Sequence, residues 1–251
     1  MVETQTTRRR ARALVALAAA GAVVGVFVAP STVEARINTE SAVVAASAVQ
    51  ALDALERWHT TSQPSDYNAF RDARQQAATV IAADLGVAPE ALLVEWETSD
   101  EAKQVAMLAA LTQLGVPYRS QASNEGVGFD CSGLTSWAFR EAGVELPRIS
   151  SDQIRSAAEV DLATVEPGDL AYYPGHVSIY IGQGLMVHSP NSGNRVEVTP
   201  LSSRTSAFGD AFTDDLVVDE TPLGDAAAAT TTPPESIDAE AEARRLWGRY
   251  L

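Results

Sequence analysis

The sequence predicts an α+β protein, in which helices fill the first half of the chain and antiparallel strands follow. Apolar residues recur at helical spacing over much of residues 37–143. Between Asp169 and Ser189 apolar and polar residues instead alternate on either side of Gly182-Gln183-Gly184, which is the pattern of a β-hairpin. With 251 residues, 46% of them hydrophobic, the chain can bury one sizeable core and carry appendages.

The charge of the chain excludes one broad class of function. It has 33 acidic and 18 basic residues, a net charge of -15, and its basic residues cluster only near the N-terminus. Nucleic-acid-binding proteins present a basic patch to the phosphate backbone. We therefore expect no nucleic-acid partner.

The N-terminal residues 1–35 have the features of a secretory signal peptide. Four arginines between Arg8 and Arg12 precede an apolar run from Ala13 to Ala29, and Val33-Glu34-Ala35 offers small residues for cleavage after Ala35. An uncleaved signal anchor is the alternative, since the run is at the lower edge of the length that spans a bilayer. We expect a secreted or cell-wall-associated protein, with no stable membrane insertion if the signal is cleaved.

Residues 36–99 are predicted to form a helical prefix. Helical periodicity covers residues 37–59, 67–85 and 90–96, and residues 60–66, which contain Pro64, form a break. We expect this prefix to pack on the domain that follows, with a regulatory flap over the active site as the alternative.

The main domain is predicted over residues 100–215. Thr98-Ser99-Asp100-Glu101 is a helix start and Gly115 ends that helix, after which residues 119–128 form a loop. Apolar residues then recur at helical spacing from Cys131 to about Gly143. The pattern therefore places the sulfur of Cys131 at the N-terminus of a helix.

Cys131 is the only cysteine of the chain. In an exported protein a single thiol is either buried and inert, used for pairing between chains, or chemically active. The positive end of a helix dipole and a nearby imidazolium both favour the thiolate, which is the nucleophilic form, and backbone N–H groups at a helix start can bind an oxyanion. The choice depends on whether a base can reach the sulfur.

The candidate bases are His176 and His188, on the two strands of the predicted hairpin. If Gly182-Gln183-Gly184 is a three-residue loop and Ile181 pairs with Leu185, the two histidines lie diagonally on one face of the sheet. A four-residue loop would place them on opposite faces, and two unrelated strand histidines are a further alternative. One cysteine and two histidines fall short of a closed zinc site, so we expect no metal and no cofactor.

Several blocks of the sequence together resemble the NlpC family of bacterial cell-wall peptidases. They lie in the family's order over about Glu101 to Arg204, and they are Gly115-Val116-Pro117-Tyr118, Gly128-Phe129-Asp130-Cys131-Ser132-Gly133-Leu134, Leu146-Pro147-Arg148, Pro167-Gly168-Asp169-Leu170, His176-Val177-Ser178-Ile179-Tyr180-Ile181-Gly182 and Val187-His188-Ser189-Pro190. The resemblance implies a papain-like α+β domain, in which the nucleophile helix packs on an antiparallel sheet that carries the base.

The resemblance also implies a function and a catalytic triad. Members of the family cleave the bond between D-γ-glutamate and a diamino acid, usually meso-diaminopimelate, in peptidoglycan stem peptides. By this likeness Cys131 is the nucleophile, His176 the general base and His188 the residue that orients His176. We expect a monomer whose partners are peptidoglycan stem peptides.

Three more positions match residues that line the family's substrate cleft, namely Tyr118, Asp130 and Ser132. From the residues alone, Tyr118 is equally well explained as a packing aromatic, Asp130 as a helix cap and Ser132 as a first-turn residue. We interpret Arg148 and Gln153 as structural residues that open the next helix.

The sequence also departs from the family. The Trp-Gly-Gly-like segment that follows the tyrosine in many members is replaced by residues 119–123, Arg-Ser-Gln-Ala-Ser, so the preferred stem peptide stays open. Residues 216–251 are predicted to be a flexible linker and a short C-terminal helix. The alternatives to a peptidase are a non-catalytic cell-wall-binding or scaffold protein with the same fold, and a related amidase or acyltransferase.

Overall fold

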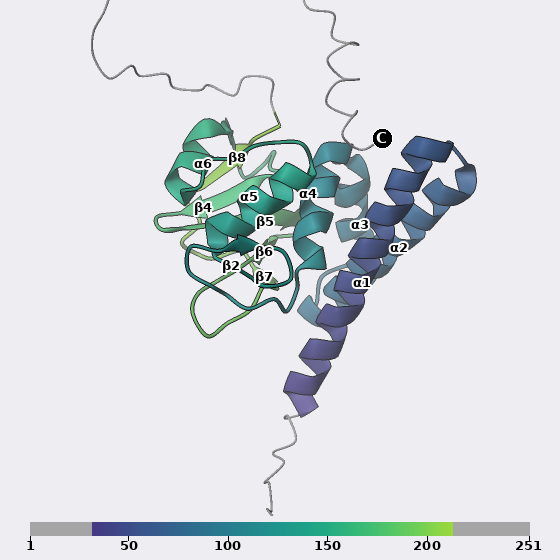
Figure 1. Ribbon diagram of the computed structural model, residues 1–251, viewed down its shortest axis with the longest axis horizontal. Coiled ribbons are helices and arrows are strands. Elements are labelled where there is room, and N and C mark those ends of the chain that lie inside the picture. The colour runs from purple at the N-terminus through teal and green to yellow at the C-terminus, as the bar shows by residue number, and fades with distance from the viewer. Residues whose placement is uncertain (1–31, 213–251) are drawn as a thin grey trace, which may run out of the picture.

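The structure is a computed structural model that describes residues 32–212 (Figure 1). Most of the predicted signal peptide, up to residue 31, and the predicted linker and C-terminal helix of residues 216–251 lie outside the described residues. The predicted cleavage point after Ala35 falls near the start of α1, Thr32–Thr61. Across residues 32–212, no helix has both the length and the apolar character that a membrane span requires.

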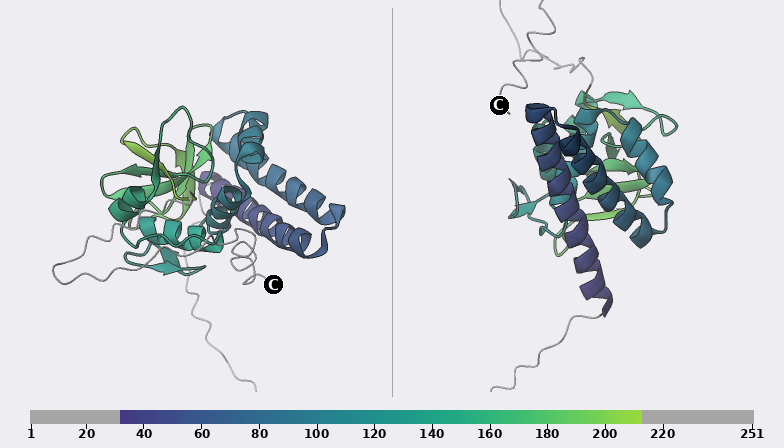
Figure 2. Two further views of the ribbon diagram at one scale, coloured as in Figure 1. Left: turned by 90° about the horizontal axis from the view of Figure 1, so that it is seen from above. Right: turned by 90° about the vertical axis from the view of Figure 1, so that its right-hand side faces the viewer.

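The prefix is helical, as predicted. Its helices are α1, α2 (Pro64–Leu85) and α3 (Pro89–Thr98), and α1 and α2 form an antiparallel pair along one side of the molecule (Figures 1 and 2). Helix α2 begins before the predicted Tyr67 because Pro64 is accommodated in a first turn, where a missing N–H costs nothing. It ends at Gly86, whose φ of 70° is the left-handed conformation that glycine adopts without strain.

The second half of the described chain combines three helices with two antiparallel sheets. Helix α4 (Glu101–Thr112) lies between the α1–α2 pair and α5 (Figure 1). The remaining elements are β1 (Ser123–Asn124), β2 (Gly128–Phe129), α5 (Cys131–Glu141), α6 (Ser150–Ser156), β3 (Ala158–Val160), β4 (Leu170–Tyr173), β5 (His176–Gly182), β6 (Leu185–His188), β7 (Glu197–Pro200) and β8 (Ala207–Asp210).

The larger sheet has six strands in the order β3-β8-β4-β5-β6-β7, and every neighbouring pair is antiparallel. Helix α5 packs on β5 near the centre of the sheet, and β1 and β2 form a separate two-stranded sheet beside α5. The α+β prediction, with the cysteine helix packed on an antiparallel sheet, is confirmed.

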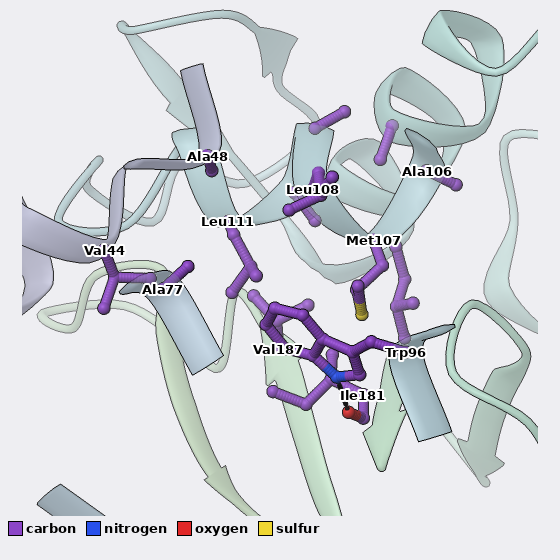
Figure 3. Packing of buried hydrophobic residues seen from close by; sticks show 14 of the residues in the cluster. Val44, Ala48, Ala77, Trp96, Ala106, Met107, Leu108, Leu111, Ile181 and Val187 are labelled. Carbon is purple, nitrogen blue, oxygen red and sulfur yellow. Dashed lines mark hydrogen bonds between the residues drawn. The ribbon is translucent and has the colours of Figure 1, made fainter. Parts of the chain in front are cut away.

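Helix α3, the last helix of the prefix, contacts the turn end of the β5–β6 hairpin. The Trp96 side chain is fully buried, and its indole Nε1 donates a hydrogen bond to the Ile181 carbonyl oxygen at 2.5 Å (Figure 3). The Gln183 backbone N–H in the hairpin turn donates to Glu95 Oε2 at 3.0 Å. At about 3.3 Å per residue this turn is about 20 Å along β5 from His176. These contacts of α3 therefore support the hairpin at the end opposite His176.

The hairpin turn differs from the prediction. Gly182 pairs with Leu185, so the loop has two residues, Gln183 and Gly184, whose φ angles of 50° and 68° fit a type I′ turn. Ile181 is the extra residue of a β-bulge. The shorter loop and the bulge offset each other, and Ile179 pairs with Val187, which is the register predicted for the histidine end of the hairpin.

A buried lysine fixes the start of β4 next to the hairpin. Lys103 Nζ in α4 lies 3.1 Å from Glu166, 2.9 Å from Asp169 and 2.8 Å from Asp210. The lysine and Asp169 are almost fully buried, and such a pair tolerates the loss of neither partner. The contact joins α4 to β4 and β8, and β4 in turn pairs with β5.

Candidate active site

Cys131 is the first residue of α5, as the sequence predicts, and it is partly exposed. The preceding Asp130 caps the helix, because its Oδ1 accepts a hydrogen bond from the Gly133 N–H at 2.8 Å. The sulfur therefore lies at the positive end of the helix dipole, which favours a negative charge there. This placement suits a thiolate nucleophile.

The loop before the cysteine is pressed against the start of α5. A Cβ built on Gly133 would lie 2.0 Å from the carbonyl oxygen of Ala122, so only glycine allows this approach. The second carboxylate oxygen of Asp130 accepts hydrogen bonds from the Gln121 N–H at 2.7 Å and from Arg148 Nη2 at 2.8 Å. The cap interpretation of Asp130 is confirmed, and its role in substrate binding stays a prediction.

The two histidines lie on one face of the hairpin and contact each other. His176 Nε2 is 2.9 Å from His188 Nδ1, and the rings meet edge to face with their centroids 5.0 Å apart. Both residues are buried, with 5% and 7% of their surface exposed. The predicted diagonal pair is confirmed, and the alternative of two unrelated histidines is wrong.

A hydrogen bond ties the histidine end of the hairpin to the segment that leads into Cys131. The Ser189 hydroxyl, next to His188, donates to the carbonyl oxygen of Phe129 at 2.8 Å. Phe129 is two residues before Cys131, and α5 packs on β5, which begins at His176. The fold therefore brings the N-terminus of α5 to the end of the β5–β6 hairpin at which both histidines lie.

The surroundings of His176 keep its imidazole neutral. The Tyr173 ring stacks on the imidazole with centroids 4.9 Å apart, and the Arg204 guanidinium lies 4.2 Å above the Tyr173 ring. Burial first, and then the neighbouring His188 and the Arg204 guanidinium, lower the pKa of His176 to about 4. At neutral pH the imidazole is therefore in the form that accepts a proton.

This shift predicts a dependence of stability on pH. An unfolded histidine has a pKa of about 6.5, so a folded pKa of about 4 stabilises the fold above pH 6.5, and that contribution is lost as the pH falls towards 4. Between pH 7.5 and 4.5 the wild-type chain should lose about 2 kcal/mol more unfolding free energy than His176→Gln. Urea unfolding of both proteins at the two pH values measures this difference, and equal losses would contradict it.

Tyr118 lies close to the thiol. Burial first, and then the neighbouring Asp130 and Cys131, raise the pKa of the Tyr118 phenol. Its backbone N–H donates to the Asn194 carbonyl at 2.9 Å, and its strand-like segment pairs with Phe129. The structure therefore brings Tyr118 and Asp130 to the same end of α5, although substrate binding by either stays a prediction.

Arg148 is a residue of this region whose contacts the sequence did not reveal. Its Nη1 donates to the Ser132 hydroxyl at 2.9 Å, and its Nη2 forms the ion pair with Asp130. It therefore bridges the two residues on either side of Cys131. No spacing rule pairs residues 16 and 18 positions apart, so only the fold shows this contact. Gln153 is fully buried and bonded to α5, which agrees with its structural interpretation.

Metal ligation is not suggested by the side chains of this region. Within residues 32–212, no group of three or more histidine, cysteine, aspartate or glutamate side chains is arranged to hold a metal ion. The side chains at the cysteine and the histidine pair instead suit proton transfer and nucleophilic attack.

Comparison with known proteins shows similarity to one family and to peptidases. Residues 115–211 match the model of the NlpC/P60 family. Over 98 residues the chain is 48% identical to the probable endopeptidase Rv2190c of Mycobacterium tuberculosis, a match that covers 38% of this chain and 25% of that protein. It is 39% identical over 98 residues to the γ-D-glutamyl-L-lysine dipeptidyl-peptidase of Bacillus cereus, covering 36% and 29% of the two chains.

A third relative bears a different activity in its name. The murein DD-endopeptidase MepH of Escherichia coli is 33% identical over 112 residues, which are 41% of each chain. Among solved structures, an NlpC/P60 family protein from Bacillus cereus is 30% identical with a TM-score of 0.43, covering 46% of this chain and 42% of that one. In these matches the chain spans between a quarter and less than half of each curated relative.

Proposed function

Residues 115–211 of this chain form an NlpC/P60 domain, and on that premise we propose that the protein is a cysteine endopeptidase that hydrolyses peptidoglycan stem peptides. The observation that carries the proposal is the buried His176–His188 pair, which the fold holds beside the helix start that bears the only cysteine. The catalytic residues proposed are Cys131, His176 and His188.

The contact between the histidines assigns a task to each ring nitrogen. When the proton of neutral His176 is on Nε2, this N–H donates a hydrogen bond to His188 Nδ1. The Nδ1 of His176 then keeps its lone pair and can accept a proton. In the proposed mechanism this Nδ1 takes the proton from the Cys131 thiol. The sulfur then attacks the carbonyl carbon of the scissile amide. A nucleophile activated by a histidine base is also used by other cysteine and serine hydrolases.

The remaining steps are the breakdown of the tetrahedral intermediate and the hydrolysis of the thioester. The tetrahedral oxyanion is bound by backbone N–H groups at the start of α5, and His176 returns the proton to the leaving amine as the C–N bond breaks. Water, deprotonated by His176, then hydrolyses the thioester and regenerates the thiol. His188 holds the imidazole of His176 in place throughout.

The bond that we propose is the one between D-γ-glutamate and the diamino acid. The support comes from the resemblance of the motifs and from the relative named as a γ-D-glutamyl-L-lysine dipeptidyl-peptidase. The relative named as a murein DD-endopeptidase makes the cross-link between stem peptides the competing target. In either case the site of action is extracytoplasmic, because peptidoglycan lies outside the plasma membrane.

Mass spectrometry of peptidoglycan digests tests both proposals together. Purified peptidoglycan is incubated with the full chain and with Cys131→Ala, and the released fragments are identified. Fragments that end in L-Ala-D-Glu, formed only by the wild type, are expected. If the cross-links are cut and the stem peptides stay intact, the enzyme cleaves the cross-link between stem peptides and the proposed D-γ-glutamyl bond is wrong. The absence of any fragment that depends on Cys131 would overturn the proposed function.

A further inference from the structure

His188 makes contacts through both of its ring nitrogens. Its Nδ1 faces His176, and its Nε2 faces strand β7, where Thr199 Oγ1 lies at 3.3 Å and Glu197 Oε1 at 3.7 Å. Strand pairing explains this placement, because His188 is directly opposite Glu197 and Thr199 is two residues further along the same face. The histidine pair is therefore the inner part of a longer chain of polar groups.

The protons in this chain depend on one another. If His188 is neutral, its single N–H is on either Nδ1 or Nε2. A proton on Nδ1 would be donated to His176 Nε2, which would force the His176 proton onto Nδ1 and leave that nitrogen unable to accept one from a thiol. A proton on Nε2 leaves His188 Nδ1 as an acceptor and keeps His176 Nδ1 basic. The tautomer of His188 thus decides whether His176 is a base.

Glu197 and Thr199 affect this choice in different ways. A hydroxyl can donate to a ring nitrogen or accept from it, so Thr199 by itself fits either tautomer of His188, but once a neighbouring carboxylate favours an N–H on Nε2, the hydroxyl accepts from that N–H and adds to the preference. A carboxylate only accepts, and its negative charge favours an N–H over a lone pair on the nitrogen that faces it. We propose that Glu197, with Thr199, is a positioning residue of the active site that holds His188 as the Nε2–H tautomer and so keeps Nδ1 of His176 free to accept a proton.

This inference rests on the proposed function for its catalytic consequence, but the tautomer itself is a property of the fold. The effect is expected to be moderate, because the Glu197 side chain is 48% exposed and its charge is partly screened by water. On the His176 side, Tyr173 from β4 stacks on the His176 ring and Arg204, from the loop after β7, lies over Tyr173. Glu197 is the carboxylate that faces the outer nitrogen of His188.

Nitrogen-15 NMR of the imidazole rings tests the tautomer directly. The chain has only three histidines, His59, His176 and His188, so the signals can be assigned with a His59→Gln variant and a His188→Gln variant. In the full-length wild type at pH 8 we expect a proton on Nε2 of both His176 and His188. In Glu197→Gln and in Thr199→Val the share of His188 with a proton on Nε2 should fall, and in the double variant it should fall further.

Kinetics of the same variants test the catalytic consequence. Each single substitution should lower kcat about two- to tenfold, the equivalent of about one hydrogen bond, with KM unchanged. Thr199→Ser keeps the hydroxyl and should retain kcat within about twofold. Glu159→Gln is the matched control, because Glu159 is an exposed glutamate on β3 at the opposite edge of the same sheet, and it should change neither the tautomer nor kcat.

Two results would overturn the inference. The first is a wild-type His188 that carries its proton on Nδ1. The second is a double variant that keeps both the Nε2–H tautomer and the kcat of the wild type. If no hydrolysis depends on Cys131, the proposed function fails, and the NMR comparison of the wild type with the double variant still decides whether Glu197 and Thr199 set the tautomer.

Discussion

Replacement of Cys131 by alanine is expected to lower kcat for peptidoglycan hydrolysis by at least about 10⁴-fold. The sulfur is the only thiol of the chain, it is partly exposed, and it sits at a capped helix start next to the end of the sheet that carries the histidine pair. The adjacent Ser132 hydroxyl is buried and accepts a hydrogen bond from Arg148, so it is not expected to replace the thiol. The loss is measured as the rate of release of soluble fragments.

A second substitution shows whether the thiol and the imidazole work as a unit. His176→Ala alone should lower kcat by about as much as Cys131→Ala, and the double variant should be no slower than either single variant. The reason is that a thiol without its base is as inactive as a base without its thiol. Losses that multiply in the double variant would mean that the two residues act independently, which would contradict the proposed mechanism.

The single cysteine also permits a control that does not need the substrate. Alkylation of the whole chain by iodoacetamide reports on Cys131 alone. At pH 7 the wild type should react faster than His176→Ala, because the neutral imidazole can take the proton from the thiol as the sulfur attacks the reagent. Equal alkylation rates in the two folded proteins would show that His176 does not assist the thiol.

Much of the site could be predicted because its residues sit on elements with strong local signals. The periodicity after Cys131 correctly places the sulfur at a helix start, and Asp130 and Gly133 have the roles that a cap and a close approach require. The helix start is a local pattern, so local sequence is sufficient to show it. The predicted register of the hairpin also places His176 and His188 on one face, but the structure reaches that register through a two-residue turn and a bulge at Ile181 and not through the predicted three-residue loop.

The rest of the site depends on contacts between distant segments. Strand β7 is short and partly exposed, and nothing in its sequence shows that it pairs with β6, so the approach of Glu197 to His188 could not be predicted. Arg148 reaches Asp130 only because the loop before α6 folds back on α5. The true loop of the hairpin was also missed, because the bulge at Ile181 coincides with the hydrogen bond that Ile181 accepts from Trp96, 85 residues earlier in the chain.

Truncation of Trp96 to alanine is therefore expected to destabilise both the fold and the hairpin. The side chain is fully buried between the prefix and the sheet (Figure 3), and loss of a buried tryptophan costs about 3–5 kcal/mol. The carbonyl of Ile181 would also lose its donor from the indole, which leaves a buried acceptor unpaired. Urea unfolding at pH 7.5 measures the loss, and the exposed Val94→Ala on the same helix should change the unfolding free energy by less than about 0.5 kcal/mol.

Trp96→Phe separates the hydrogen bond from the packing. Phenylalanine keeps most of the buried ring but has no donor for the Ile181 carbonyl, so we expect a loss of about 2 kcal/mol, less than for alanine. Because the bulge at Ile181 lets a two-residue turn coexist with the register that pairs the histidines, weakening it should also broaden the NMR signals of His176 and His188. If Trp96→Phe is as stable as the wild type and its histidine signals are unchanged, then the turn alone sets the register and α3 is not needed to hold the bulge.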